Sequence, residues 1–185
     1  MQAAEDEELN RLLSSFECEL DPDIESFLVK RAVPFEQLSK SRTYLVIDED
    51  ELKAKTIGEI TVLGYISLAP RVLSVPDEVS NRVRKELDGL SAKIHGAQIT
   101  SFPVYLIGQL GRNSKVTRSV LPGGDLLALA FDVIQSAVDA VGGRYILIEC
   151  HEDERLVKFY RNHAFDEFAK IPDLGKPMVQ MIRRI

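Results

Sequence analysis

The middle of the chain, residues 104–150, carries a strand pattern, a helix pattern and a second strand pattern in that order. Val104-Tyr105-Leu106-Ile107 is an unbroken apolar run, which is typical of a strand buried on both faces. After a polar loop, residues 122–141 place apolar side chains at helical spacing, and Gly142-Gly143 ends that helix. Residues 144–150 form a strand rich in Tyr, Ile and Leu. A strand–helix–strand connection makes its two strands parallel, so the sequence predicts a mixed α/β fold with one sheet.

The remaining patterns predict further helices and strands on both sides of this unit. Asp21 is a good helix cap directly before Pro22. The charged residues Arg82, Arg84, Lys85, Glu86 and Asp88 favour a solvated helix face. The predicted elements are a helix at 21–38, a strand at 43–47, a polar turn at 48–55, a strand at 56–68 with Gly58 and Gly64 as bulges or close approaches, a helix at 76–90 ended near Gly89, a helix at 152–162 and a strand at 178–182.

The length and charge of the chain bound its organisation. Its 185 residues correspond to one domain with a full core. The formal net charge is −6, but residues 1–25 alone carry nine acids against one base, Arg11. We therefore expect an acidic, partly helical N-terminal lead-in at residues 1–15 and a single domain at 16–185. The body is nearly neutral, so charge neither requires nor excludes a nucleic-acid partner.

Several classes of protein are disfavoured by the residues that are scarce. Two cysteines, Cys18 and Cys150, are too few for a disulfide scaffold or a cysteine-based zinc site. The three histidines have no metal-ligand spacing, so we expect no metal. No apolar run reaches the ~20 residues of a membrane span, and the acidic N-terminus is unlike a signal peptide. We expect a cytoplasmic protein that does not associate with a membrane.

The loop between the central strand and the long helix has the chemistry of an anion site. It contains Lys115 and Arg118, and Gly123 and Gly124 open the helix. Free amides at a helix start, together with the helix dipole, attract negative charge, and glycine lets a ligand approach the backbone. A plain helix start after a Pro-Gly turn is the alternative. The loop is neither a P-loop nor a dinucleotide fingerprint.

A second informative segment, residues 158–165, follows the last strand of the central unit. Phe159 and Phe165 fit a buried helix face, whereas a phenol at a helix end, here Tyr160, can donate a proton or a hydrogen bond. Tyr160 is therefore a candidate catalytic residue.

At these positions the chain resembles the GNAT superfamily of acyl-CoA-dependent N-acetyltransferases. Residues 106–113 with 123–127 resemble the cofactor strand, pyrophosphate loop and helix of that family, and residues 153–160 with Ala164-Phe165 resemble its late helix. The N-terminal stretches resemble the branch that contains the toxin-type GNATs of toxin–antitoxin pairs. These stretches are residues 16–19, 24–28, 42–45 and 64–69.

The resemblance implies a GNAT fold, with one central mixed sheet, a splayed parallel strand pair and flanking helices. It implies that the pantetheine arm of acetyl-CoA pairs with backbone groups near Leu110, Gly111 and Arg112. The pyrophosphate would then sit on the amides of Gly123, Gly124 and Asp125, with Arg118 or Lys115 as a supplement. The chain departs from the family in this loop, because Ser119-Val120-Leu121-Pro122 lacks the usual early glycine.

The resemblance also implies direct attack of a primary amine on acetyl-CoA in a ternary complex. Tyr160 would donate to the leaving CoA thiolate, whose free thiol has a pKa of roughly 8.5. Glu149 is a candidate general base, although a water relay is an alternative. Cys150 fits a buried small residue better than a covalent acetyl carrier, and His151 and His163 fit surface positions.

The sequence leaves three functions open. They are acetylation of a small or protein amine, acetylation of the amino group of charged tRNA by a toxin with an antitoxin partner, and acyl-CoA binding without catalysis. We expect residues 73–101 and the acidic N-terminus to determine the choice of acceptor. Homodimers are common in the family, but no pattern here decides the oligomeric state.

Overall fold

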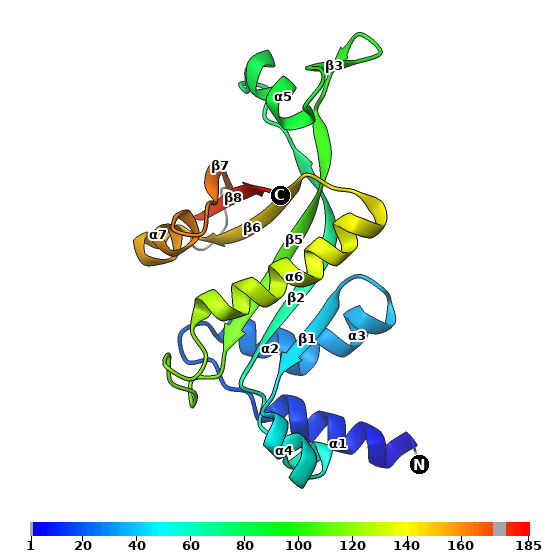
Figure 1. Ribbon diagram of the computed structural model, residues 1–185, viewed down its shortest axis with the longest axis vertical. Helices are drawn as coiled ribbons and strands as arrows, with labels where there is room; N and C mark the ends of the chain where they lie inside the picture. Colours follow the sequence, from blue (N-terminus) through cyan, green and yellow to red (C-terminus); the bar gives the residue numbers. More distant parts are fainter. Residues whose placement is uncertain (1, 172–176) are drawn as a thin grey trace. The chain divides into compact units, whose positions relative to one another are not determined.

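A computed structural model describes residues 2–171 and 177–185 (Figure 1). The contacts divide the chain into two compact units. Unit 1 comprises Met1–Ala69 and Ile107–Ala140, and unit 2 comprises Pro70–Leu106 and Val141–Ile185. Two long strands, β2 (Gly64–Ser74) and β5 (Ser101–Arg112), contribute residues to both units.

Unit 1 is rich in helices, and its N-terminal elements follow local capping signals. Asp21 caps α2 by accepting a hydrogen bond from the Asp23 amide at 3.0 Å, as the sequence predicts. The unit contains α1 (Gln2–Ser14), α2 (Pro22–Lys30), α3 (Ala32–Gln37), β1 (Arg42–Val46), α4 (Glu49–Ala54), a 3-10 turn (Ile57–Glu59) and α6 (Gly123–Val141).

Two predictions for unit 1 helices are wrong. The single helix expected at 21–38 is two helices that break at Arg31, because Pro34 has no amide hydrogen to donate one turn back. The polar turn expected at 48–55 is the helix α4, which Asp48 caps by accepting from the amides of Asp50 and Glu51. No residue of α4 is buried, so an apolar stripe could not reveal it.

The strand expected at 56–68 is also different in the structure. It begins only at Gly64 and continues to Ser74, after a 3-10 turn that has a capping box between Thr56 and Glu59. Gly64 is a close-approach position, as predicted, because a Cβ there would lie 2.7 Å from Leu121 Cδ2 and 3.0 Å from the Gly111 carbonyl oxygen.

The core of unit 1 joins its N-terminal helices to β2. Tyr65 is fully buried, its ring lies edge-on to Phe16 with centroids 5.1 Å apart, and its hydroxyl donates to the Ile24 carbonyl at 2.6 Å. The buried members are Leu12, Leu13, Phe16, Cys18, Phe27, Leu28, Ala32, Ile60, Val62 and Tyr65. Helix α1 therefore supplies two buried leucines, whereas the domain boundary at residue 15 stays a prediction.

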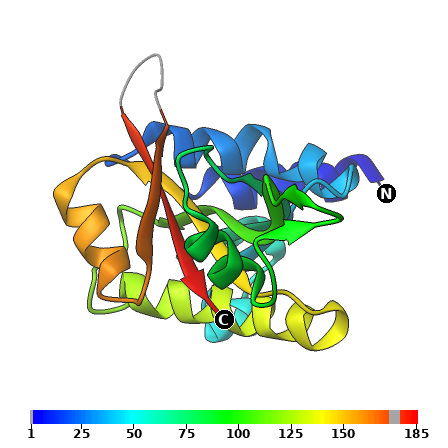
Figure 2. The same cartoon turned by 90° about the horizontal axis from the view of Figure 1, so that it is seen from above.

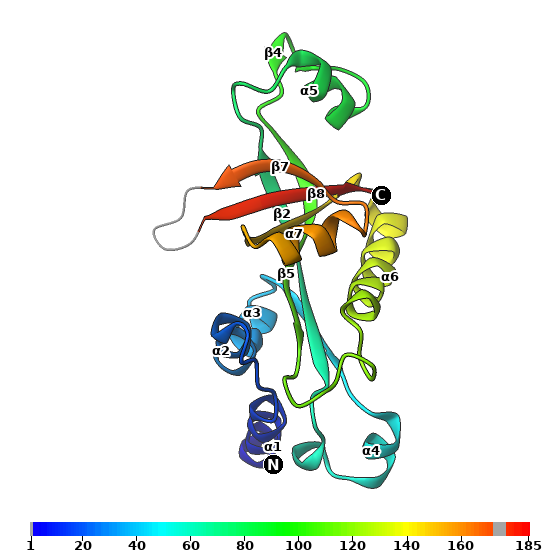
Figure 3. The same ribbon diagram turned by 90° about the vertical axis from the view of Figure 1, so that its left-hand side faces the viewer.

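Unit 2 combines the far ends of β2 and β5 with the C-terminal strands. It contains α5 (Asn81–Asp88), the short strands β3 (Lys93–Ile94) and β4 (Ala97–Gln98), β6 (Tyr145–His151), α7 (Glu154–Arg161), β7 (Asp166–Ile171) and β8 (Met178–Arg184). The strands β7 and β8 lie side by side (Figure 2, Figure 3). The edge strand β7 was missed because it is charged, and a bulge between Glu167 and Ala169 interrupts its alternation.

Strand pairing confirms the mixed α/β prediction. Among the described residues, the main sheet has the order β1-β2-β5-β6-β8-β7, and β3 and β4 form a separate hairpin. The β5–β6 pair is parallel, as the strand–helix–strand pattern predicts, and β1–β2, β6–β8 and β7–β8 are antiparallel. The double burial expected for residues 104–107 is wrong, because Tyr105 and Leu106 are only half-buried.

The solvated face expected for residues 82–88 is wrong at Arg84. Helix α5 starts later than expected, at a Ser80 cap, and ends as predicted at Gly89, whose φ is +89°. Arg84 is 1% exposed, and its guanidinium donates to backbone carbonyls of Val79, Pro76, Asp77 and Ile99. This guanidinium ties α5 to the segments on either side of it.

Candidate functional site

The end of β5 packs tightly against the N-terminal helices of unit 1. A Cβ at Gly111 would lie 2.5 Å from Ile24 Cγ2 and 3.1 Å from Phe16 Cζ, so only glycine fits there without displacement. The next residue, Arg112, is half-buried, and its Nη1 donates to the Leu121 carbonyl at 3.4 Å. Within the described residues its Nε has no partner and is buried. Leu110, the third predicted residue of this strand, is half-buried.

Asn113 fixes the start of the loop that leads to α6. Its side chain is fully buried and donates through Nδ2 to the carbonyls of Ser15 at 2.9 Å and Val62 at 2.8 Å. Its Oδ1 accepts from the Lys115 amide at 3.0 Å, and its own amide donates to the Leu63 carbonyl at 2.9 Å. This one side chain therefore ties the loop to two other segments of unit 1.

The two basic residues of the loop differ in their surroundings. Lys115 forms an ion pair with Glu17, and the amide of Ser114 donates to the Glu17 carbonyl at 2.8 Å. Arg118 is exposed. Lys115 is therefore already engaged in unit 1, and Arg118 is the freer of the two predicted anion ligands.

Helix α6 starts with amides that the protein leaves free. Within the described part of the chain, no acceptor binds the amides of Gly123 and Gly124, whereas the Asp125 amide donates to the Pro122 carbonyl at 3.1 Å. Leu126 and Leu127 are fully buried and hold this first turn in place. A 19-residue helix with two free glycine amides at its start offers a site for an anion.

Tyr160 lies in unit 2, near the end of α7, as the sequence predicts. It is 7% exposed, and its ring packs edge-on against Phe159 and Phe165 with centroids 5.1 and 5.8 Å apart. Burial, and to a lesser degree the nearby Cys150 thiol, raises the pKa of the Tyr160 phenol well above its ordinary value. No hydrogen bond to the Tyr160 hydroxyl is found within the described part of unit 2. The phenol is therefore protonated and free to donate.

Glu149 and Cys150 occupy opposite faces of β6. Glu149 is half-buried, and the Nε2 of its cross-strand neighbour Gln180 donates to its Oε1 at 2.9 Å. Cys150 is 8% exposed, and burial followed by the carboxylates of Glu167 and Asp153 raises the pKa of its thiol to about 11. A thiol with that pKa is a poor nucleophile, which fits the prediction of a buried packing residue.

The two C-terminal histidines are both half-buried, not on the open surface as expected. His151 ends β6, and its Nδ1 is buried without a partner among the described residues. The Nδ1 of His163 lies 2.7 Å from the Phe159 carbonyl oxygen. Among residues 2–171 and 177–185, no group of three His, Cys, Asp or Glu side chains is placed to hold a metal ion.

The structure thus gathers the predicted site residues in two places. Unit 1 holds the end of β5 and the start of α6, and unit 2 holds Tyr160 and Glu149. Sequence reasoning missed Asn113 and Gln180, whose contacts join segments that are far apart in the chain. Only the strand register, which pairs Glu149 with Gln180, could have revealed the latter contact.

Comparison with known proteins gives matches at the level of structure. No family model and no curated protein matches the chain. A crystal structure of a tyrosine-to-phenylalanine mutant of KacT is 18% identical, with a TM-score of 0.63 over 91% of this chain and 85% of that one. AtaT complexed with acetyl-methionyl-tRNAfMet is 20% identical, with a TM-score of 0.62 over 90% of this chain and 85% of that one. AtaTR bound with acetyl-CoA is 23% identical, with a TM-score of 0.61 over 91% of this chain and 84% of that one.

The chain has the GNAT fold. This confirms the fold that the sequence resemblance implies, and the parallel β5–β6 pair is the pair in which the resemblance places the cofactor strand. None of the helices in the described part of the chain is long and apolar enough to cross a membrane.

Proposed function

We propose that the chain is an acetyl-CoA-dependent N-acetyltransferase of the toxin type, and that its acceptor is the amino group of an aminoacyl-tRNA. The observation that carries the proposal is the match over about nine-tenths of the chain to structures that hold acetyl-CoA and acetyl-methionyl-tRNA. An antitoxin partner belongs to the same proposal, because AtaT is also found bound to the C-terminus of the antitoxin AtaR. Both the acceptor and the antitoxin are inferred for this chain from those proteins.

The donor would be held by the residues gathered in unit 1. The free amides of Gly123 and Gly124 would take the pyrophosphate of acetyl-CoA, since they are the groups at the start of α6 that the protein leaves unused. Arg118 is exposed nearby in the sequence and would add a positive charge. Backbone groups of Leu110, Gly111 and Arg112 would pair with the pantetheine arm in the manner of an added strand.

Tyr160 would act on the sulfur that leaves. When the amine attacks the thioester carbonyl, the C–S bond breaks and its electron pair goes to the CoA thiolate. The raised pKa of Tyr160 means that the phenol keeps its proton, so it would stabilise the thiolate first by a hydrogen bond. Full transfer of the proton from Tyr160 to the CoA thiolate would require that exclusion of water also raises the pKa of the CoA thiol.

Glu149 would accept the proton that the amine loses. An amine attacks only in its neutral form, and the carboxylate of Glu149 accepts a hydrogen bond from Gln180 that restricts its orientation. The position of Glu149 one residue before the buried Cys150 places it on the other face of β6 from that thiol.

The test is the Tyr160→Phe variant, assayed for acetyl transfer and for acetyl-CoA binding. Phe keeps the packing against Phe159 and Phe165, and in the described part of unit 2 no group loses a hydrogen bond. We expect kcat to fall by ~10²–10⁴-fold and the affinity for acetyl-CoA to stay within about two-fold of the original. Tyr44→Phe on β1 removes a phenol that is 41% exposed and serves as the matched control.

Acetyl transfer should be measured on methionyl-tRNA, on other aminoacyl-tRNAs and on a panel of small amines and peptides. A Tyr160→Phe variant with full rate would refute the role given to this side chain. Acetylation of small amines but of no aminoacyl-tRNA would refute the acceptor and leave a general N-acetyltransferase. Acetyl-CoA binding with transfer to none of the acceptors would refute catalysis and indicate a binding module.

A further inference from the structure

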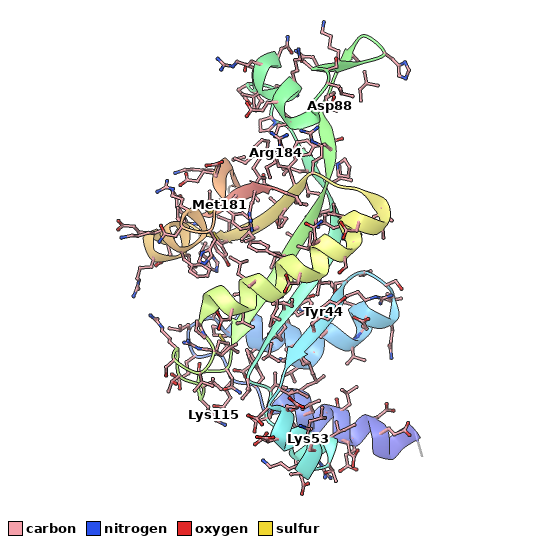
Figure 4. All side chains as sticks on the ribbon, in the orientation of Figure 1. Tyr44, Lys53, Asp88, Lys115, Met181 and Arg184 are labelled. Atoms are coloured by element: carbon pink, nitrogen blue, oxygen red, sulfur yellow. The ribbon has the colours of Figure 1, made fainter. Side chains whose placement is uncertain are left out.

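Unit 2 contains a cationic pocket that the proposed acetyl transfer does not use. The pocket is a hollow of about 420 Å³ lined by α5, the residue before β6 and the end of β8. Its lining residues are Arg82, Lys85, Glu86, Gly89, Arg144 and Arg184, which amount to four cations and one carboxylate. Figure 4 labels Asp88 at the end of α5 and Arg184 at the end of β8.

The four cations of the pocket form no ion pair with a described residue, whereas some basic side chains elsewhere in the chain do. Arg11, Lys53 and Arg161 each form an ion pair with a glutamate. Among the described residues, none of the cations of the pocket lies within ion-pair distance of a carboxylate. Outside residues 1–25 the chain has 20 acidic and 22 basic residues, so it has nearly enough carboxylates to pair every cation. Four cations around one hollow, with one carboxylate in its described lining, create a local positive potential that attracts an anionic ligand.

One of these cations is held rigidly. Arg144 donates through Nη1 to the Asp88 carbonyl at 2.7 Å, and its guanidinium lies 6.0 Å from the ring centroid of Tyr145. Gly89 makes room for it, since a Cβ there would lie 1.7 Å from Arg144 Nη1. The side chains of Arg82, Lys85 and Arg184 are exposed around this fixed group.

Stability of α5 explains only part of this arrangement. Arg144 donates to the Asp88 carbonyl at the C-terminal end of the helix, where the helix dipole makes a cation favourable. Arg82 lies in the first turn of the same helix, where a positive charge opposes the helix dipole. Its presence there is therefore not accounted for by helix stability.

We propose that this pocket binds phosphate groups, either those of a small polyphosphate or those of an RNA backbone. Guanidinium groups bind phosphate oxygens through paired hydrogen bonds, and a fixed arginine loses little freedom on binding. Glu86 is the single carboxylate among the described lining residues and weakens the attraction for an anion, so its charge tunes the affinity. The proposal does not depend on acetyl transfer.

The experiment is isothermal titration of the intact protein with inorganic tripolyphosphate and with a twelve-nucleotide single-stranded RNA. Saturating coenzyme A is present throughout, so that a phosphate site at the start of α6 is already occupied. The test variant is Arg82→Gln/Lys85→Gln. The control is Arg155→Gln/Lys158→Gln on α7, which removes two exposed charges at the same spacing. Glu86→Gln is added as a variant that should bind more tightly.

We expect the pocket variant to bind tripolyphosphate at least ten-fold more weakly, the α7 control to bind within two-fold of the original, and Glu86→Gln to bind several-fold more tightly. If RNA is the source of the phosphate, RNA also binds, and its salt slope falls by ~0.7 for each lost contact. If a free polyphosphate is the source, only tripolyphosphate binds. Absence of binding to both probes overturns the proposal, as does equal weakening by the pocket variant and the α7 control.

Discussion

Replacing Asn113 with alanine tests whether one buried side chain anchors the loop before α6. The side-chain amide of Asn113 makes three hydrogen bonds. Its Nδ2 donates to the carbonyls of Ser15 and Val62, and its Oδ1 accepts from the backbone amide of Lys115. Alanine removes all three and leaves the Val62 carbonyl buried with one partner fewer. The perturbation is confined to unit 1, because every one of these groups lies there.

The expected loss follows from the number of bonds and their burial. A typical hydrogen bond contributes ~1 kcal/mol net, and an unsatisfied buried partner adds to the loss. Three bonds, of which the Val62 bond is buried, give about 3 kcal/mol. For a chain of this length, 1 kcal/mol corresponds to ~2–4 °C in Tm, so Asn113→Ala should lower Tm by ~6–12 °C.

The assay is urea unfolding followed by circular dichroism, with thermal melting as a second measurement. Asn10→Ala is the matched control, because Asn10 is exposed on α1 and alanine is a better helix former, so this variant should be neutral or slightly stabilising. A loss below about 1 kcal/mol for Asn113→Ala would refute the assignment of Asn113 as the anchor. The m-value is the slope of the unfolding free energy against urea concentration, and a change in it means that the unfolded or native state has altered compactness. The free energies of unfolding are therefore compared only between proteins with the same m-value.

Three further predictions follow from buried contacts. Gly111→Ala should destabilise the chain by ~1–3 kcal/mol in the same unfolding assay, because its Cβ would lie 2.5 Å from Ile24 Cγ2, and an unchanged stability would refute that packing. Arg84→Met should cost ~4 kcal/mol, since four backbone carbonyls each lose a hydrogen bond worth ~1 kcal/mol, and hydrogen exchange should speed up first at the Val75 amide, which donates to the Thr100 carbonyl. The third concerns pH. The pKa of the Cys150 thiol is raised from 9.0 to about 11, so above pH 9 the unfolded chain loses a proton that the folded chain keeps. The free energy of unfolding should therefore fall as the pH rises from 9 to 11, by up to about 1.4 kcal/mol per pH unit from this group, and a Cys150→Ala variant with the same decline would refute that contribution.

The central strand–helix–strand unit could be predicted because its signals are local. The apolar stripe of α6 runs for five turns and ends at Gly142 and Gly143, both of which have the positive φ that favours glycine. The apolar residues of β6 are typical of a buried strand. The strand spans Tyr145–His151, one residue later at each end than the predicted 144–150. A connection of this kind fixes the parallel order of its strands whatever the details of the loop.

The errors lie where a local pattern has two meanings. Asp48 followed by acidic residues reads as a polar turn, and it is equally a helix cap with a favourable first turn. Arg84 reads as one charge on a solvated face, yet its guanidinium is buried among carbonyls that come from residues 76–79 and 99. The local conformational preference of these residues does not distinguish a turn from a helix cap, or an exposed arginine from a buried one. Contacts with distant segments of the chain decide between them.

The candidate catalytic residues show the same division between local and distant information. Tyr160 could be located from sequence because it lies on a short helix directly after a strand, with apolar neighbours at helical spacing. The orientation of Glu149 could not, because it depends on a hydrogen bond to Gln180 that exists only in one register of β6 against β8. A shift of that register by one residue would turn Gln180 to the other face of the sheet. The register is held by apolar residues of the same strands, since Leu147 and Ile182 pair directly and both lie in the core of unit 2. The packing of that core therefore determines the position of the proposed base.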